Sequence, residues 1–148
     1  MVRLPPPVWM LIYALAAAGV SWWAGWPGTD AMRNLPLGAA LFAIGCLLPG
    51  WAIALFRRAG TELRPDSPAN AALVAHGPYR LTRNPMYLGL TVAALGLAIM
   101  VGAWPMLAVP AAVFATANWV HIPFEEAKMG RQFGAAYEDY CARVRRWV

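Results

Sequence analysis

Charged residues are scarce in this sequence, and their scarcity excludes an ordinary soluble domain. They make up 13% of the 148 residues, where a soluble domain has about a quarter. Apolar residues make up 60%, and the mean hydropathy is +0.48. Residues 4–29, 34–56 and 84–124 contain no Asp, Glu, Lys or Arg. The composition is therefore typical of an integral membrane protein.

Cysteine is also scarce, which argues against a disulfide framework. Cys46 lies in the second apolar run and Cys141 in a polar C-terminal segment. A membrane would separate the two thiols, and neither has the spacing of a metal site, so we expect no disulfide and no metal. The net charge of +5 is attributed to attraction for anionic membrane lipids rather than for nucleic acid, because the cations are not interleaved with stacking aromatics.

The charge-free runs predict an all-α, polytopic membrane protein with about four transmembrane helices. A helix needs about 20 apolar residues to cross a bilayer, so the first two runs supply one span each and the third supplies two. The third run divides at residues 102–105, because Pro105 suits the first turn of a helix. The predicted spans are residues 8–26, 36–57, 86–103 and 105–122, in one domain that covers residues 1–148.

The basic residues predict the orientation of these spans. With four spans, both termini and a loop at residues 58–85 lie on one side of the membrane. All of the 12 Lys and Arg residues except Arg33 lie on that side. Because basic loops are retained in the cytoplasm, we expect the loop and both termini to be cytoplasmic, at the inner or plasma membrane. Trp22, Trp23 and Trp104 would then lie at the outer interface.

The polar tail is predicted to form a cytoplasmic amphipathic helix over residues 123–143. Pro123 suits its first turn, and Glu125 and Glu126 lie near its positive end. Five apolar or aromatic side chains recur at helical spacing along it. They are Met129, Phe133, Tyr137, Tyr140 and Val144. Composition alone favours a helix that lies on the membrane surface as an anchor.

The loop before the third span has the residues of a ligand site. Backbone N–H groups at a helix start near Pro85 favour an anion, and Arg83 adds donors there. Tyr79 and Tyr87 offer flat faces that suit an aromatic ring or an onium ion. Membrane anchoring predicts the same residue types at the cytoplasmic end of a span, so this local pattern leaves both interpretations open.

Two sequence blocks resemble one family of membrane enzymes. GPYRLTRNPMYLG at residues 77–89 fits the pattern GxYxxxR(H/N)PxYxG, and the segment at residues 125–147 contains EE followed by FGxxYxxYxxxVxR. Together they resemble the isoprenylcysteine carboxyl methyltransferases and the wider group that includes phospholipid methyltransferases. The resemblance implies a cytoplasmic site for S-adenosylmethionine (SAM), released as S-adenosylhomocysteine, and a lateral opening for a lipophilic acceptor.

The resemblance also implies roles for individual residues. The positions that match cofactor-binding positions of the family are Ala71, Ala72, Leu73, Val74, Tyr79, Arg83, Asn84, Pro85, Met86, Tyr87 and Glu125. His121 lies where family enzymes that act on prenylcysteine have a substrate-contacting arginine. Ala71 and Asn84 also depart from the family, which often has histidine at both positions. The acceptor therefore stays open among carboxyl, amine, phenol and thiol groups.

These residues suit the chemistry of methyl transfer. SAM has a carboxylate, an ammonium, an adenine ring and a sulfonium, which call for a cation, an acid and aromatic faces. Positioning of the two reactants dominates such an in-line displacement and is worth about 7–11 kcal/mol. An amine acceptor would also need a base, for which His121 or Glu126 is suitable. Together with Arg83 they are the candidate catalytic residues, although His121 also suits an interfacial position and Glu126 a helix cap.

Two other functional classes compete with an enzyme. A small four-helix transporter normally has an ionisable group within the membrane, and the predicted spans have no Asp, Glu, Lys or Arg. A non-enzymatic membrane subunit would use the polar loop only as an anchor, and should not bind S-adenosylhomocysteine. The sequence leaves the oligomeric state open.

Overall fold

In the part of the chain described by the computed structural model, residues 5–28, 31–60 and 72–148, the regular elements are all helices. The all-α class is therefore confirmed. The α-helices are α1 (Pro6–Trp23), α2 (Leu35–Arg58), α3 (Pro85–Val101), α4 (Ala108–Thr116), α5 (Ile122–Phe133) and α6 (Ala135–Arg143). Short 3-10 helices at Gly77–Arg80 and Trp104–Leu107 and a π-helical turn at Ala117–His121 connect them.

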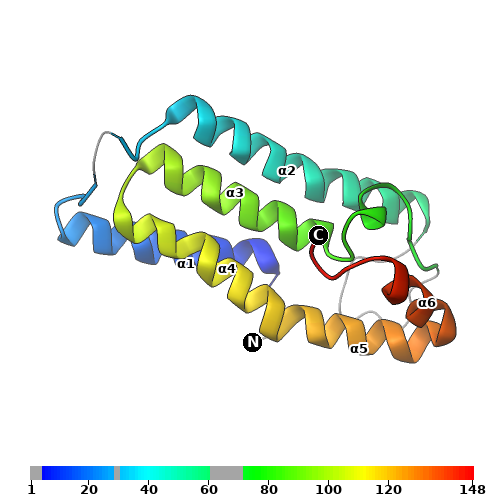
Figure 1. Ribbon diagram of the computed structural model, residues 1–148. Coiled ribbons are helices and arrows are strands. Elements are labelled where there is room, and N and C mark those ends of the chain that lie inside the picture. The colour runs from blue at the N-terminus through cyan, green and yellow to red at the C-terminus, as the bar shows by residue number, and fades with distance from the viewer. Residues whose placement is uncertain (1–4, 29–30, 61–71) are drawn as a thin grey trace.

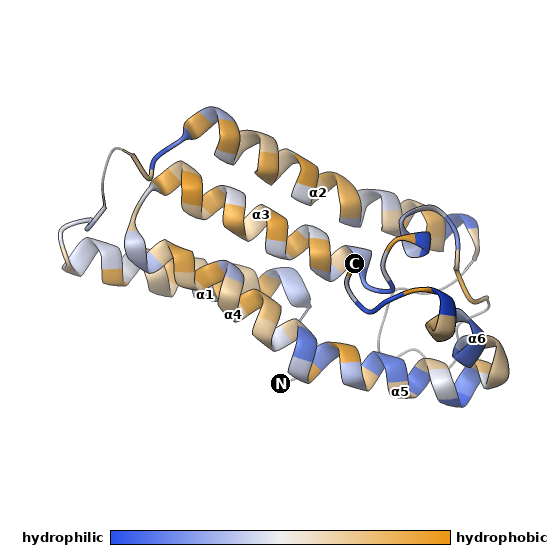
Figure 2. Ribbon diagram, in the orientation of Figure 1, coloured by the Kyte–Doolittle hydropathy of each residue, from blue (hydrophilic) through white to orange (hydrophobic). Residues whose placement is uncertain are grey.

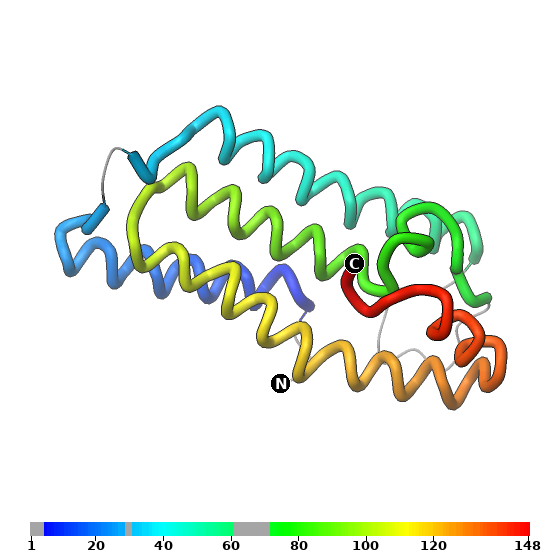
Figure 3. Tube along the Cα trace, viewed as in Figure 1, coloured from blue at the N-terminus to red at the C-terminus, as the bar shows by residue number. Residues whose placement is uncertain are grey.

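Helices α1 to α4 run side by side in alternating directions (Figure 1). The α1–α2 and α3–α4 connections lie at one end, which we call the turn end (residues 24–28 and 102–107). There the N–H of Trp104 donates to the carbonyl of Pro27 at 2.8 Å. The opposite end, which we call the site end, consists of the loop at residues 72–84, α5, α6 and residues 144–148, as the tube trace shows (Figure 3).

Small residues allow α2 and α3 to approach closely along their length. A β-carbon on Gly45 of α2 would lie 2.3 Å from the backbone nitrogen of Ala93, and one on Gly89 of α3 would lie 2.6 Å from the carbonyl oxygen of Gly45. Both distances are far below van der Waals contact. Small residues are the usual means of bringing helices together where solvent cannot drive their association.

The hydropathy of the residues divides the molecule into two parts. Apolar residues predominate in α1 to α4 and hydrophilic residues at the site end (Figure 2). By length and composition, two described helical stretches can cross a membrane, Leu35–Arg58 and Trp104–Phe133, while the apolar α3 has 17 residues. The bounds of α1, α2 and α3 agree with the predicted spans to within three residues. The number of membrane crossings stays a prediction.

The predicted fourth span, residues 105–122, and the start of the predicted tail helix belong to one continuous helical stretch. The chain stays helical from Trp104 to Phe133. Within the π-helical turn that precedes Pro123, the N–H of Ile122 donates to the carbonyl of Ala117. A proline lacks the N–H of the normal helical ladder. Because the ladder is already widened at the π-helical turn, the helix continues past Pro123 instead of restarting there.

The tail predicted as a single helix at residues 123–143 consists of two helices, α5 and α6, because the chain breaks at Gly134. This residue has φ 52° and ψ −128°, a conformation that glycine adopts without the steric penalty of a side chain. The break separates α5 from α6 and turns α6 back towards the loop. The predicted stripe still packs as one group, in which Tyr137 and Tyr140 are buried and Met129, Phe133 and Val144 are partly buried.

Candidate functional site

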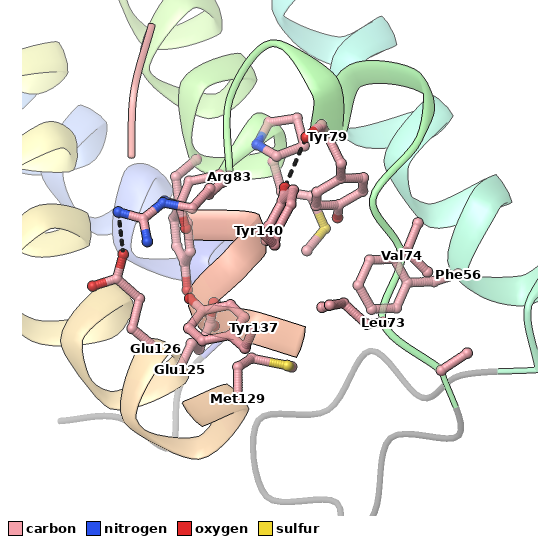
Figure 4. A pocket seen from close by; sticks show the side chains of 15 residues that line it. Phe56, Leu73, Val74, Tyr79, Arg83, Glu125, Glu126, Met129, Tyr137 and Tyr140 are labelled. Atoms are coloured by element: carbon pink, nitrogen blue, oxygen red, sulfur yellow. Dashed lines mark hydrogen bonds and ion pairs between the residues drawn. The ribbon is translucent and has the colours of Figure 1, made fainter. Parts of the chain in front are cut away.

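A partly enclosed pocket lies at the site end, between the loop that leads into α3 and helices α5 and α6 (Figure 4). Its cavity volume is about 80 Å³. The lining residues are Phe56, Ala72, Leu73, Val74, Tyr79, Arg83, Asn84, Pro85, Met86, Tyr87, Glu125, Glu126, Met129, Tyr137 and Tyr140. The fold therefore brings the two sequence blocks together around one cavity.

The pocket contains most of the residues singled out from the sequence. Every predicted cofactor-binding residue that the structure describes lines it, and so do Arg83 and Glu126. Ala71 lies outside the described residues, and His121 does not line the cavity. Phe56 was not predicted, because nothing in a span marks which apolar residue faces a pocket. Met129, Tyr137 and Tyr140 were predicted only as a packing stripe.

A short hydrogen bond joins the start of α3 to α5 across the pocket. The hydroxyl of Tyr87 donates to Oε1 of Glu125, with an O–O distance of 2.6 Å. Tyr87 is buried, and Glu125 is half-buried in the first turn of α5. Hydrogen bonds to a carboxylate are the strong ones in proteins. This bond therefore fixes the orientation of the carboxylate.

A second carboxylate, that of Glu126, forms ion pairs with two arginines. Its Oε1 lies 3.2 Å from Nη2 of Arg83, and Arg146 contacts both oxygens. Nη1 of Arg83 also donates to the thiol of Cys141. Burial acts to lower the pKa of Arg83, but the charge of Glu126 and then Cys141 outweigh it, so the pKa is raised. Arg83 is therefore a charged and already paired residue on the pocket wall.

Asn84 uses its side-chain amide to bind the chain beyond α6. Its Nδ2 donates to the carbonyl of Arg146 at 2.9 Å. The backbone N–H of Asn84 donates to Oγ1 of Thr82 at 3.1 Å, and the Thr82 hydroxyl donates to the same Arg146 carbonyl at 3.0 Å. The amide thus holds the segment that precedes α3 against the C-terminal residues.

Two tyrosines of the pocket lining are joined by a hydrogen bond. The hydroxyl of Tyr140 donates to the backbone carbonyl of Tyr79 at 2.7 Å (Figure 4). Burial raises the pKa of Tyr140 to about 12, although the charge of Arg83 acts to lower it. Burial also raises the pKa of Tyr79. The hydroxyl of Tyr79 is buried and has no hydrogen-bond partner among the described residues.

His121 lies directly behind Tyr87. Its side chain is 3% exposed, and its ring stacks on that of Tyr87 with centroids 5.9 Å apart and an interplanar angle of 23°. Its Nε2 finds no hydrogen-bond partner in the described ranges. The neighbouring polar residue of the π-helical turn, Asn118, accepts a hydrogen bond from the indole N–H of Trp147 at 3.0 Å.

Comparison with known proteins identifies the family. The family model for phospholipid methyltransferases matches residues 34–136. The chain belongs to this family. The match includes α2, α3, α4 and α5, and hence both walls of the pocket up to the break at Gly134. No solved structure matches the chain at a significant level.

Curated relatives within this methyltransferase family include enzymes with different acceptors. Protein-S-isoprenylcysteine O-methyltransferase A of Arabidopsis thaliana is 30% identical over 112 residues, 72% of this chain and 55% of the relative. Methanethiol S-methyltransferase 2 of Bradyrhizobium diazoefficiens is 31% identical over 147 residues, 95% of this chain and 49% of the relative. The chain spans about half the length of these curated relatives.

Proposed function

We propose that this chain is an integral membrane methyltransferase that takes its methyl group from SAM and transfers it to a lipophilic acceptor. The observation that carries the proposal is the pocket itself. Two blocks that are distant in sequence converge on it and supply an acid, Glu125, and aromatic walls from Tyr79 and Tyr87. The runner-up functions, a transporter or a non-enzymatic subunit, do not require these groups to meet.

The polar atoms of the pocket fit a ligand with the groups of SAM. Buried polar atoms normally have hydrogen-bond partners. Four described side-chain atoms do not, and three of them line the pocket or stack against its wall: Oη of Tyr79, Nε of Arg83 and Nε2 of His121, while the other is Nε1 of Trp9. A hydroxyl-bearing and charged ligand in the pocket would give the Tyr79 hydroxyl and Nε of Arg83 hydrogen-bond partners.

The size and apolar lining of the pocket also affect how SAM would fit into it. Leu73, Val74, Met86 and Met129 give the cavity an apolar wall that suits an adenine ring. A volume of about 80 Å³ has room for several water molecules. A molecule as large as SAM would fill this space and extend beyond it, so we propose that cofactor binding widens the pocket.

The residues around the pocket would act by holding and orienting the reactants. Bound SAM would supply an electrophilic methyl group on a sulfonium. Glu125, fixed by Tyr87, would bind a positively charged or hydroxyl group of the cofactor, and Arg83 would contribute its charge to the opposite wall. Orientation of this kind accounts for about 7–11 kcal/mol in favourable cases. Little proton transfer is needed for an acceptor that is already anionic.

The structure favours different roles for the two candidate bases. Both oxygens of Glu126 contact guanidinium groups, so accepting a proton would disrupt two ion pairs. We therefore assign Glu126 to positioning Arg83 and Arg146. His121 has an unpartnered Nε2 beside Tyr87 and lies where α4 enters the polar end. We propose that it receives the proton of a neutral acceptor that approaches from the apolar side.

The acceptor class follows from where such a molecule must enter. α1, α2 and the π-helical turn present apolar side chains on their outer faces, including Leu15, Leu47 and Trp119. A lipophilic acceptor would partition into the bilayer and reach His121 from that side. The two relatives methylate an oxygen and a sulfur according to their names, so we propose an oxygen or sulfur nucleophile on a membrane-partitioned molecule, with an amine as the less favoured alternative.

The test is titration of the detergent-solubilised protein with S-adenosylhomocysteine by calorimetry. We expect saturable binding by the wild type and about tenfold to hundredfold weaker binding by Glu125→Gln, because a hydrogen bond to a charged group is worth about 1.5–3 kcal/mol. Glu138→Gln is the matched control, since Glu138 is exposed on α6. Absence of binding by the folded wild type would favour the non-enzymatic subunit or the transporter.

A further inference from the structure

Arg145, Arg146 and Trp147 contact three segments around the pocket: the loop before α3, helix α5 and the π-helical turn that precedes α5. We propose that residues 145–147 are a clasp that sets the separation of the two pocket walls, with Arg146 and Trp147 as positioning residues for the cofactor. This inference rests on the proposed function, because it concerns how the same pocket is held in shape. Figure 3 shows the C-terminal segment beside the start of α3.

The first contact of the clasp is with the segment that leads into α3. The backbone N–H of Arg83 donates to the carbonyl of Arg145 at 2.9 Å. The carbonyl of Arg146 accepts from both Thr82 and Asn84. Thr82 and Asn84 are buried. These hydrogen bonds fix the chain just before Tyr87, the residue that orients the carboxylate of Glu125.

The second contact is with α5. Nε and Nη2 of Arg146 bind Oε1 and Oε2 of Glu126 at 3.2 and 2.5 Å. A guanidinium that donates to both oxygens of a carboxylate fixes its orientation as well as its position. Glu125 is the preceding residue of the same helical turn. The clasp therefore holds the α5 wall by the residue next to the proposed cofactor ligand.

The third contact is with the π-helical turn that carries His121. The indole N–H of Trp147 donates to Oδ1 of Asn118, and its ring lies 4.6 Å from that of Phe114, centroid to centroid. Trp147 also packs against the buried group of Tyr87, Ala117 and Ile122. π-helical turns recur at functional sites. Trp147 therefore links the π-helical turn to Tyr87, a residue that lines the proposed cofactor pocket.

The position of these contacts predicts an effect on binding rather than on folding. The side chain of Arg146 is 36% exposed, and an ion pair of that kind contributes little to stability. Apart from the clasp, three described side-chain hydrogen bonds, Tyr87 to Glu125, Tyr140 to Tyr79 and Arg83 to Cys141, link the loop and α3 to the tail helices, together with the Arg83–Glu126 ion pair. Loss of the clasp should therefore loosen the pocket while α1 to α4 stay packed.

The experiment measures S-adenosylhomocysteine affinity and the thermal unfolding midpoint of the same detergent-solubilised variants. We expect Trp147→Phe, which keeps a ring but removes the indole N–H, to bind about twofold to tenfold more weakly. Asn118→Ala should give the same loss, and the double variant should lose no more than either single one. Trp104→Phe is the control, because Trp104 is exposed at the turn end.

Arg146 is tested by the graded pair Arg146→Lys and Arg146→Ala. Lysine has one charged group in place of the guanidinium fork, so we expect affinity between those of wild type and Arg146→Ala. Arg143→Ala is the control, because this exposed arginine donates to Asp139 within its own helix. All variants should unfold within a few degrees of the wild type.

The outcomes separate the clasp from the proposed function. If the wild type binds S-adenosylhomocysteine and Trp147→Phe and Arg146→Ala bind it equally well, the clasp is refuted and the function stands. If affinity falls only in step with the unfolding midpoint, the segment is a structural support and the clasp is again refuted. If the folded wild type does not bind, both proposals fail.

Discussion

The α2–α3 interface and the site end are held together by different interactions. Along α2 and α3, backbone packs on backbone because Gly45 and Gly89 have no side chains. At the site end, side chains of Arg83, Glu126 and Arg146 join segments that are distant in sequence. The packing of α2 on α3 depends on residues without side chains, whereas the structure of the site end depends on particular hydrogen-bond donors and acceptors.

This difference determines where a substitution acts. Small interhelical contacts are shared along the whole length of two helices, so adding atoms there affects the entire fold. The hydrogen bonds of the site end each join one pair of groups, so removing one should alter the pocket locally. We infer that α1 to α4 form a rigid scaffold and that the pocket geometry is adjusted by a few polar contacts.

The largest expected effect comes from filling the α2–α3 interface. Gly45→Leu places a side chain where a single β-carbon would already be 2.3 Å from backbone, so we expect loss of the folded, monodisperse protein. Gly50→Leu, on the same helix, is the control, since nothing lies within 4 Å of its β-carbon position. Size-exclusion chromatography in detergent measures both. Equal behaviour of the two variants would contradict the close packing described for α2 and α3.

A smaller and more local effect is expected from Tyr137→Ala. Tyr137 is 9% exposed and lies in the apolar group that holds α6 against α2 and the loop. Removing a buried aromatic ring costs about 3–5 kcal/mol in a closed core, and less here because the ring borders a cavity. We expect faster tryptic cleavage in the tail with little change in the unfolding of α1 to α4. A global loss of stability would instead show that the two regions unfold as one unit.

The sequence predicted the two regions unequally well. The helical parts of α1, α2 and α3 followed from apolar runs, because hydropathy and proline positions are local properties. The residues around the pocket followed from the matching blocks, although their binding roles stay predictions. In contrast, the continuation of the helix past Pro123 depends on a π-helical turn, and the break at Gly134 on where α6 must pack. Neither is a property of the neighbouring residues alone.

The polar partners of the site end were the least predictable. Arg83 was expected to offer a cation to a ligand, but the structure pairs it with Glu126 and Cys141. Asn84 was expected at the cofactor, and although it lines the pocket, its amide binds the carbonyl of Arg146. No spacing rule connects residues 82–84 to residues 145–147, because the chain between them forms α3, α4, α5 and α6. Only the folded arrangement shows which groups are already engaged.

The smallest expected effect tests whether water reaches the buried Tyr140 hydroxyl at the site end. Burial raises the pKa of Tyr140 from 10.0 to about 12. The phenol therefore stays protonated in the folded state while it ionises in the unfolded state. Its contribution to stability is fully present below pH 10 and is lost as the pH rises through 12. We expect the tyrosinate absorbance of the folded protein to lag behind that of the unfolded protein over this interval.

The variant Tyr140→Phe assigns this lag to one residue. It removes the phenol that donates to the carbonyl of Tyr79, so its titration should lack the component near pH 12 that the wild type shows. The same substitution leaves a buried carbonyl without its partner, which should make the tail slightly easier to cleave. If Tyr140 instead titrates near pH 10 in the folded protein, water reaches this hydroxyl. The site end would then be a solvated surface, and its contrast with the tightly packed helices would be one of composition rather than of burial.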